Sequence, residues 1–212
     1  MPTLVIGDVH GCAQELAELL QLGEASRIVL VGDLFTKGPD PVGVWELIQE
    51  YELEAVLGNQ DARLIAAADG MRPADIAAVA CAQKLSTTGD AWLRWLRSRP
   101  LFLEAAGFVV VHAGLHPSGD LNQTTRSMAL SMRSFPMDSA TAPPWHEQYT
   151  GSKGVVFGHD ARRGPVRVER DGRPFLLGLD SGCVYGRQLT GVFLEEDRTV
   201  TVNAKAVYEA VS

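Results

Sequence analysis

The sequence has few cysteines, no long apolar segment and no excess of positive charge. Its 212 residues include three cysteines, Cys12, Cys81 and Cys183, an odd number without the paired C-x-x-C spacing of zinc or redox sites, so disulfides are not expected. No apolar run approaches the roughly 18 residues that a membrane helix needs. The segment after Met1 lacks the basic and apolar regions of a signal peptide. We therefore expect a cytoplasmic protein without a membrane anchor.

The charge balance is acidic, with 26 Asp and Glu against 19 Lys and Arg and a net charge of −7. Proteins that bind nucleic acid stably usually carry a basic face, so this class of partner is not expected. Local arginines remain available for a small phosphorylated or nucleotide substrate. The hydrophobic share of 46% is ordinary for a globular protein, and the length favours a single domain over 1–212. The sequence does not indicate the oligomeric state.

The first half of the chain alternates between strand and helix patterns. Short apolar runs bounded by turn residues predict strands at 4–6, 27–31 and 55–57. Apolar residues at helical spacing predict helices at 12–22, from Pro41 onward, at about 61–68 and through most of 73–99. Such alternation is typical of parallel strands connected by helices.

The second half shows shorter periods. A hairpin is expected at 101–112, followed by strands at 154–157, 165–169, 174–179, 189–195 and 199–207, so we expect this half to be mainly antiparallel. The stretch at about 115–150 lacks a strand pattern and is expected to form a small lid, helical around 125–133. The predicted fold class is α/β, a sandwich of two mixed sheets packed face to face with outer helices.

Polar residues recur where the predicted strands end. A carboxylate or an amide follows each strand of the first half beside a glycine, and two later strands end in histidine beside a glycine. The carboxyl ends of strands in an open sheet border the ligand crevice, so these turns should converge there. The candidate residues are Asp8, His10, Asp33, Asn59, His112 and His159.

This mixture of oxygen and nitrogen ligands favours manganese, iron or zinc over magnesium or calcium, which prefer oxygen ligands alone. Six side chains can serve two divalent ions about 3.5–4 Å apart if one aspartate bridges them, and Asp33, central in this order, is the candidate. Taken singly, each Gly-Asp could be a simple turn and each histidine a structural residue. Their ordered recurrence has no competing structural explanation that we can find.

The motifs resemble those of calcineurin-like metallophosphoesterases, in particular the phosphoprotein-phosphatase branch with its bacterial symmetrical dinucleoside-tetraphosphatases. The G-D-x-H-G motif is complete at 7–11, H-A-G lies at 112–114 and G-H at 158–159. The resemblance implies a first metal on Asp8, His10 and Asp33, and a second on Asp33, Asn59, His112 and His159. It also implies a metal-bridging hydroxide as the nucleophile, with Asp33, Asn59 and His112 as the catalytic residues and Mn²⁺ as the first choice of metal, Fe or Zn being possible.

Two motifs depart from the family pattern. G-D-x-x-D-R-G is replaced by a segment carrying Thr36 and Lys37, and G-N-H-E by one carrying Gln60. In the family, the missing Asp and His act together to protonate the leaving oxygen. General acid catalysis contributes about 10²–10⁴-fold and matters most for poor leaving groups. A nucleotide phosphate, whose last pKa is about 6, can leave without that proton.

We therefore expect a two-metal phosphoesterase that favours phosphate anhydrides or activated phosphate esters, with dinucleoside polyphosphates as the natural substrate class. Lys37, Arg63 and Arg133 are the candidates for binding substrate phosphate, although Arg133 could equally be a solvated lid residue. Two alternatives stay open. The chain could be a serine/threonine protein phosphatase of low efficiency, or a catalytically reduced, metal-containing binding or regulatory module.

Overall fold

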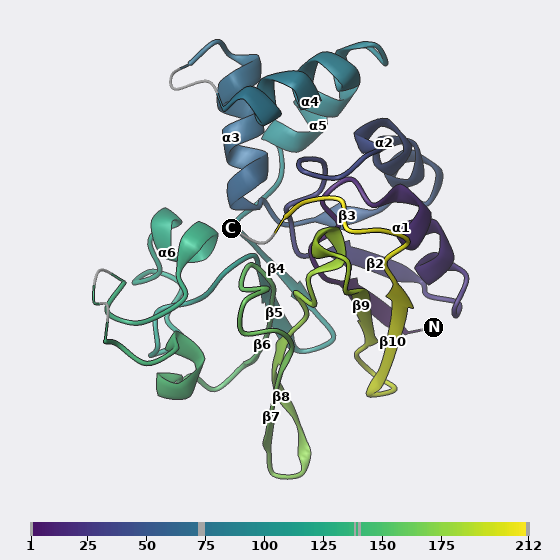
Figure 1. The fold of residues 1–212 in the computed structure, drawn as a ribbon. Coiled ribbons are helices and arrows are strands. Elements are labelled where there is room, and N and C mark those ends of the chain that lie inside the picture. Colours follow the sequence, from purple (N-terminus) through teal and green to yellow (C-terminus); the bar gives the residue numbers. More distant parts are fainter. Residues whose placement is uncertain (1, 72–74, 138, 140, 211–212) are drawn as a thin grey trace.

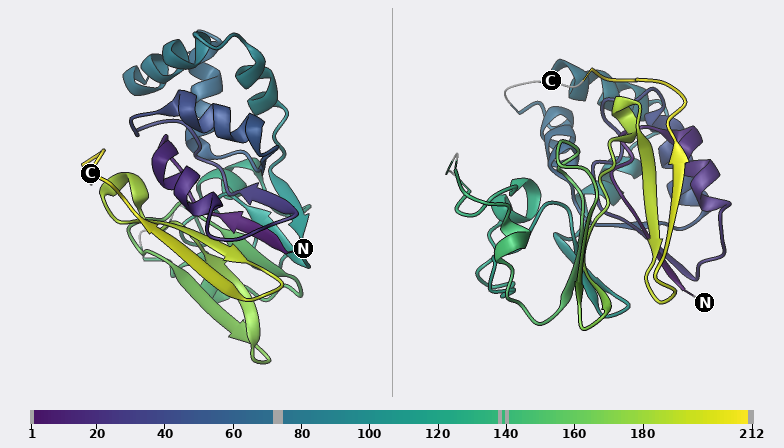
Figure 2. Two further views of the ribbon diagram at one scale, coloured as in Figure 1. Left: turned by 90° about the vertical axis from the view of Figure 1, so that its right-hand side faces the viewer. Right: turned by 60° about the horizontal axis from the view of Figure 1, so that its bottom comes forward.

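The structure is a computed structural model that describes residues 2–71, 75–137, 139 and 141–210. Two five-stranded sheets pack face to face, and helices cover their outer sides (Figure 1). The right-hand view of Figure 2 shows the two sheets as separate layers, with α1 on one outer side and the α6 segment on the other. This arrangement is the α/β sandwich expected from the sequence. In the described part of the chain, no helix is both long and apolar enough to cross a membrane.

The first sheet contains the strands of the first half and the last two strands of the chain. Its order is β10 (Arg198–Asn203), β9 (Gln188–Phe193), β1 (Thr3–Ile6), β2 (Arg27–Leu30) and β3 (Glu54–Ala55). β1, β2 and β3 are parallel, and β9 is antiparallel to both of its neighbours. The outer face is covered by α1 (Ala13–Leu20) and α2 (Pro41–Glu50).

Alternation along the strands separates two parts of the core. Leu4 and Ile6 pack with Leu16 of α1, whereas Val5, between them, packs against the second sheet with Val110. Successive side chains of a strand point to opposite faces, so a strand covered on both sides reads as a continuous apolar run. The short apolar runs in the sequence are of this kind.

The second sheet has the order β4 (Phe102–Ala105), β5 (Phe108–Val111), β6 (Gly154–Phe157), β8 (Arg173–Gly178) and β7 (Val166–Arg170). Only its two outer pairings, β4 with β5 and β7 with β8, are antiparallel; β5, β6 and β8 are parallel. The expectation of a mainly antiparallel second half is therefore wrong for the centre of this sheet. Parallel neighbours need a long crossover connection, and the segment between β5 and β6 supplies one.

That crossover segment was expected to form a lid. It contains α6 (Arg126–Ser131) and the short 3₁₀ helix η1 (Trp145–Gln148), and its apolar side chains pack on the outer face of the second sheet. Trp145 is 1% exposed and contacts Phe157 of β6 with ring centroids 5.0 Å apart. The segment is thus mainly an outer layer of the sandwich, because burial of Trp145 holds it against the sheet.

Three helices connect β3 to β4: α3 (Asn59–Ala68), α4 (Ile76–Ser86) and α5 (Ala91–Arg97). The expected helical segment 73–99 is divided near Gly89, whose φ of 92° suits glycine, and its start at Pro73 lies outside the described residues. The 3₁₀ helix η2 (Cys183–Tyr185) precedes β9. The last strand ends at Asn203, earlier than expected, and the chain continues across the top of the first sheet (Figure 1).

Candidate metal centre

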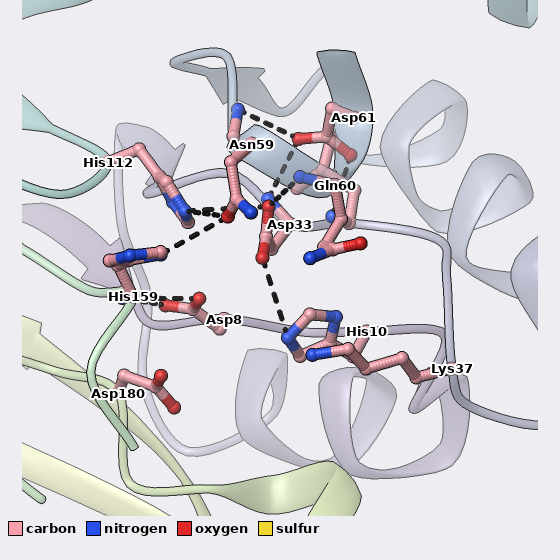
Figure 3. Close-up of polar contacts among 12 residues, drawn as sticks. Asp8, His10, Asp33, Lys37, Asn59, Gln60, Asp61, His112, His159 and Asp180 are labelled. Carbon is pink, nitrogen blue, oxygen red and sulfur yellow. Dashed lines mark hydrogen bonds and ion pairs between the residues drawn. The ribbon is translucent and has the colours of Figure 1, made fainter. Parts of the chain in front are cut away.

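The six candidate ligands all lie at one edge of the sandwich, where the loops after β1, β2, β3, β5 and β6 meet (Figure 3). Asp8, His10, Asp33, His112 and His159 are at most 7% exposed. Their convergence follows from parallel strands ending at a common edge. The structure therefore brings together every residue that the sequence motifs singled out for metal binding.

Backbone conformation is unusual at several of these positions. His10, Asp33 and His159 have φ angles of 49°, 54° and 73°, in the left-handed region that non-glycine residues seldom adopt. Such conformations persist where the surrounding structure enforces them, and they cluster at functional sites. The glycine of the last motif has a different purpose, since a Cβ at Gly158 would collide with the carboxylate of Asp8.

A buried carboxylate ties two of the site loops together. Asp61 is fully buried, and its Oδ2 accepts hydrogen bonds from the backbone N–H groups of Asp33 at 2.8 Å and Gly58 at 3.0 Å. Its Oδ1 accepts a third, from Leu34 at 3.0 Å. Asp61 thus positions the loop that carries Asp33 against the start of α3. This role was not predicted from the sequence, although the position of Asp61 two residues after Asn59 was a usable signal.

Asp33 occupies the middle of the centre. Its Oδ2 lies 3.6 Å from His10 Nε2, and its Oδ1 lies 3.5 Å from His112 Nε2. The backbone N–H of Gln60 donates to Oδ1 at 2.8 Å and fixes the orientation of the carboxylate. One potential metal-ligand atom from each of Asp8, Asp33 and His112 also lies within 4.8 Å of the other two. Asp33 therefore faces both groups of ligands, as a bridging residue must.

The tautomer of His112 can be inferred from its contacts. Nδ1 lies 2.9 Å from the carbonyl oxygen of Val31, which can only accept, so Nδ1 carries the hydrogen. Nε2 then presents a lone pair towards Asn59 Oδ1 at 3.0 Å. His159 Nδ1 approaches the same oxygen at 3.1 Å. Acceptor atoms that converge in this way fit a shared cation. A carbonyl oxygen that accepts a hydrogen bond from the ring nitrogen facing away from the metal is typical of metal-bound histidine.

Burial shifts the protonation equilibria of the centre in a consistent direction. It raises the pKa of Asp33 to about 6 and that of Asp8 well above its usual range, where the charges of Asp180 and Asp33 add to the effect. It lowers the pKa of His112 to about 4 and that of His10 well below the usual value. The carboxylates crowd one another and the imidazoles are neutral. Both properties suit divalent cations, which bind carboxylate and neutral imidazole.

A cleft of about 160 Å³ opens beside these residues and is called the catalytic cleft below. Its lining includes His10, Asp33, Lys37, Asn59, Gln60, Arg133, His159, Ala161, Arg162, Asp180, Tyr185 and Arg187. Two of the three expected phosphate-binding residues, Lys37 and Arg133, therefore lie where they were expected. The third, Arg63, lines a neighbouring cavity instead.

Besides Gln60, four polar residues of the cleft lining were not among the candidate site residues. Asp180 follows β8 and is 6% exposed; burial raises its pKa to about 6. Its position at a strand end, in Asp-Ser-Gly, repeats the pattern of the other site residues and could have identified it. Tyr185 accepts a hydrogen bond from Lys37 Nζ at 2.9 Å. Arg162 and Arg187 line the cleft because loops that are distant in the sequence fold together.

Known proteins resemble this chain over most of its length. A bis(5'-nucleosyl)-tetraphosphatase (symmetrical) of Aeromonas hydrophila is 34% identical over 94% of this chain and 97% of its own. The asymmetrical bis(5'-nucleosyl)-tetraphosphatase PrpE of Bacillus subtilis is 27% identical, over 97% and 96% of the two chains. A crystal structure of "a putative diadenosine tetraphosphatase" superimposes with a TM-score of 0.80 at 29% identity, covering 95% of this chain and 93% of that one.

This structural match confirms the predicted sandwich of two mixed sheets. The model of the calcineurin-like phosphoesterase family matches residues 1–163, a span that contains all six candidate ligands. The match covers about three quarters of the chain. The match and the convergence of the strand-end residues support the same family assignment. The chain belongs to the calcineurin-like phosphoesterase family, and it is a phosphohydrolase of the kind that uses divalent metal ions.

Proposed function

We propose that this enzyme hydrolyses the phosphoanhydride bonds of dinucleoside polyphosphates. The observation that carries the proposal is a contrast around the metal centre: the six ligand residues are in place, five of them buried, while Thr36 and Gln60 stand where the family has its acid pair. An enzyme without a proton donor works best on leaving groups that need none. A nucleotide phosphate is such a group, because its conjugate acid has a pKa of about 6.

The proposed metal ligands divide into two groups that share Asp33. Asp8 and His10 would hold one ion with it, and Asn59, His112 and His159 the other. Mn²⁺ is the first choice, and Fe or Zn would also suit the mixed oxygen and nitrogen set. When bound, a metal pair supplies activated water and neutralises charge on the phosphoryl oxygens. The hydrogen bond from His112 Nδ1 to Val31 O orients the imidazole for this purpose.

Side chains around the ions would position the substrate. Lys37 and Arg133 both line the cleft and offer positive charge to phosphate oxygens. Arg133 Nε lies 3.4 Å from Asp160, and Arg163 pairs with the same carboxylate at 2.8 Å, so Asp160 keeps a partner when Arg133 turns to a phosphate. Gln60 presents an amide in place of the family's histidine, so it can donate a hydrogen bond to the leaving oxygen without transferring a proton. These roles bind and orient the substrate and leave bond cleavage to the activated water.

The test compares Mn²⁺-dependent hydrolysis of diadenosine tetraphosphate, p-nitrophenyl phosphate and a phosphoserine peptide, each with a chelator control. We expect turnover of the first two and little of the third. Faster turnover of the peptide would refute the proposal in favour of a protein phosphatase, and silence on all three despite bound metal would favour a binding module. Chromatography of the nucleotide products would also distinguish symmetrical cleavage, which gives two ADP, from asymmetrical cleavage, which gives AMP and ATP.

A further inference from the structure

A second cavity of about 490 Å³ adjoins the catalytic cleft. It lies between the loop after β2, helices α3 and α4, and the end of the described chain at 209–210. The two spaces share three lining residues, Lys37, Gln60 and Tyr185. Figure 3 shows Lys37 and Gln60 on one side of Asp33, with His112 and His159 on the other. The second cavity thus begins where the metal centre ends.

The two spaces differ in volume and therefore in the size of the ligand that each can hold. Pockets that enclose a ligand of drug size usually measure about 300–1,000 Å³. The catalytic cleft, at about 160 Å³, has room for phosphoryl groups but not for a nucleotide as well. A long substrate whose reacting phosphate lies at the metal centre must therefore place its remainder elsewhere. The second cavity is large enough and shares a wall with the cleft.

The lining of the second cavity combines three cationic side chains with two carboxylates, Asp75 and Glu209, and a wall of small apolar side chains. Arg63 and Lys84 reach it from α3 and α4, and Lys37 lies at its boundary. The guanidinium of Arg63 makes no ion pair within the described part of the chain, so it is available to an anion. Ala77 and Ala80 of α4 leave space that larger residues would fill. Phosphate and nucleoside groups would each find a suitable surface.

Most departures from the family motifs gather at this cavity. Three of the four replaced residues, Thr36, Lys37 and Gln60, line it, whereas the fourth, Asp61 in place of Glu, is fully buried and keeps a carboxylate. Thr36 is 3% exposed, and its Oγ1 is buried without a hydrogen-bond partner. This oxygen is therefore shielded from the cavity, and Lys37 and Gln60 are the replaced residues that can meet a ligand there. The replacements at these two positions are therefore explained together as the adaptation of one wall to a new ligand.

We propose that the second cavity binds the leaving nucleotide of a dinucleoside polyphosphate. Arg63 and Lys84 contact its phosphates, and the alanines of α4 face the nucleoside. Water adds to phosphorus, the bridging P–O bond breaks, and the nucleotide departs with the bonding electrons into the cavity. This inference rests on the proposed function, because it assigns a place to the second half of the proposed substrate.

Arg63→Ala and Ala80→Trp test the cavity by removing its charge and by filling its space. We expect either change to lower the ratio of kcat/KM for diadenosine tetraphosphate to kcat/KM for p-nitrophenyl phosphate at least about tenfold, since charge-assisted contacts are among the stronger polar interactions. Arg94→Ala on α5 is the matched control: it removes an exposed helical arginine, paired with Asp90, and should leave the ratio unchanged. Thermal melting verifies that each variant is folded.

Equilibrium binding of ADP to the metal-free protein, measured by calorimetry, separates this inference from the proposed function. ADP binding that Arg63→Ala weakens about tenfold supports the cavity even if wild-type protein fails to cleave diadenosine tetraphosphate, in which case only the substrate assignment falls. Equal losses on both substrates would place Arg63 in the catalytic cleft and overturn the inference. Unchanged ratios together with unchanged ADP binding would overturn it while the proposed function stands.

Discussion

The two sides of the catalytic cleft differ in how closely they keep the family pattern. On the side of His112 and His159, each motif residue is present, buried and in contact with another. On the opposite side, Thr36, Lys37 and Gln60 replace the family's residues and border open space. A shared cation constrains all of its ligands at once, so none can change alone. Residues that meet only the substrate can change whenever the substrate does.

The largest loss of activity is expected from a change on the ligand side of the cleft. Asp33→Asn keeps the hydrogen bond from Gln60 N–H but removes the charge that faces His10 and His112. We expect at least about a hundredfold loss of Mn²⁺-dependent hydrolysis of p-nitrophenyl phosphate, because metal ions supply several kcal/mol of transition-state stabilisation. Metal content measured on the same samples should fall. Asp171→Asn, in an exposed turn with φ of 53°, is the control, and a fully active Asp33→Asn would refute the bridging role.

The crowding of carboxylates on the ligand side predicts a pH effect on the metal-free protein. Burial raises the pKa of Asp180 from 3.8 to about 6, so its neutral form is favoured in the folded state. Its stabilising contribution is present below about pH 4 and is lost as the pH rises through 6. Asp180→Asn should therefore become more stable than the wild type over this interval, by up to about 3 kcal/mol at pH 7.

Urea denaturation at several pH values measures that difference. Gly182 N–H donates to Asp180 Oδ1 at 3.1 Å, and asparagine can accept the same hydrogen bond, so the variant isolates the charge. Saturating Mn²⁺ should reduce the difference in stability between Asp180→Asn and the wild type, because a cation stabilises the ionised carboxylates near it in the wild type. A difference in stability that does not vary with pH would contradict the electrostatic explanation.

The altered side can be tested by restoring the family residues. Thr36→Asp combined with Gln60→His should raise hydrolysis of a phosphoserine peptide at least about tenfold, because a paired acid assists a poor leaving group. Gln60→His alone should gain little, since an unoriented imidazole is a weak acid catalyst. Thr36→Asp alone should destabilise the protein, because position 36 is buried. Equal gains from Gln60→His and from the double variant would refute the pairing argument.

The smallest effect is expected at Lys37, the boundary between the two spaces. Lys37→Arg keeps the charge and restores a planar fork that can bind two phosphate oxygens. We expect KM for p-nitrophenyl phosphate to fall about two- to fivefold with little change in kcat, as for improved binding of both ground and transition states. Lys153→Arg, at an exposed pair with Glu104, is the control. A rise in KM would show that the hydrogen bond to Tyr185 matters more than the fork.

The sequence was sufficient to predict the ligand side of the site. Asp8, Asp33 and His112 each follow a strand beside a glycine, and parallel strands deliver their ends to one edge. The altered side was harder to interpret. Arg63 was a candidate for binding substrate phosphate, and α3 places it at the second cavity and not at the catalytic cleft. Whether a helix turns a side chain towards one space or its neighbour depends on packing that local spacing does not specify.

Local patterns in this chain determined the strand ends, their glycines and the order of the candidate ligands, because strand alternation and turn chemistry are properties of adjacent residues. Tertiary structure alone decided the rest. The parallel centre of the second sheet depends on how the crossover segment packs, through Trp145, on its outer face. The role of Asp61 and the second cavity depend on contacts between loops far apart in sequence. Such contacts form only when the two sheets assemble, so they cannot be predicted from patterns of adjacent residues.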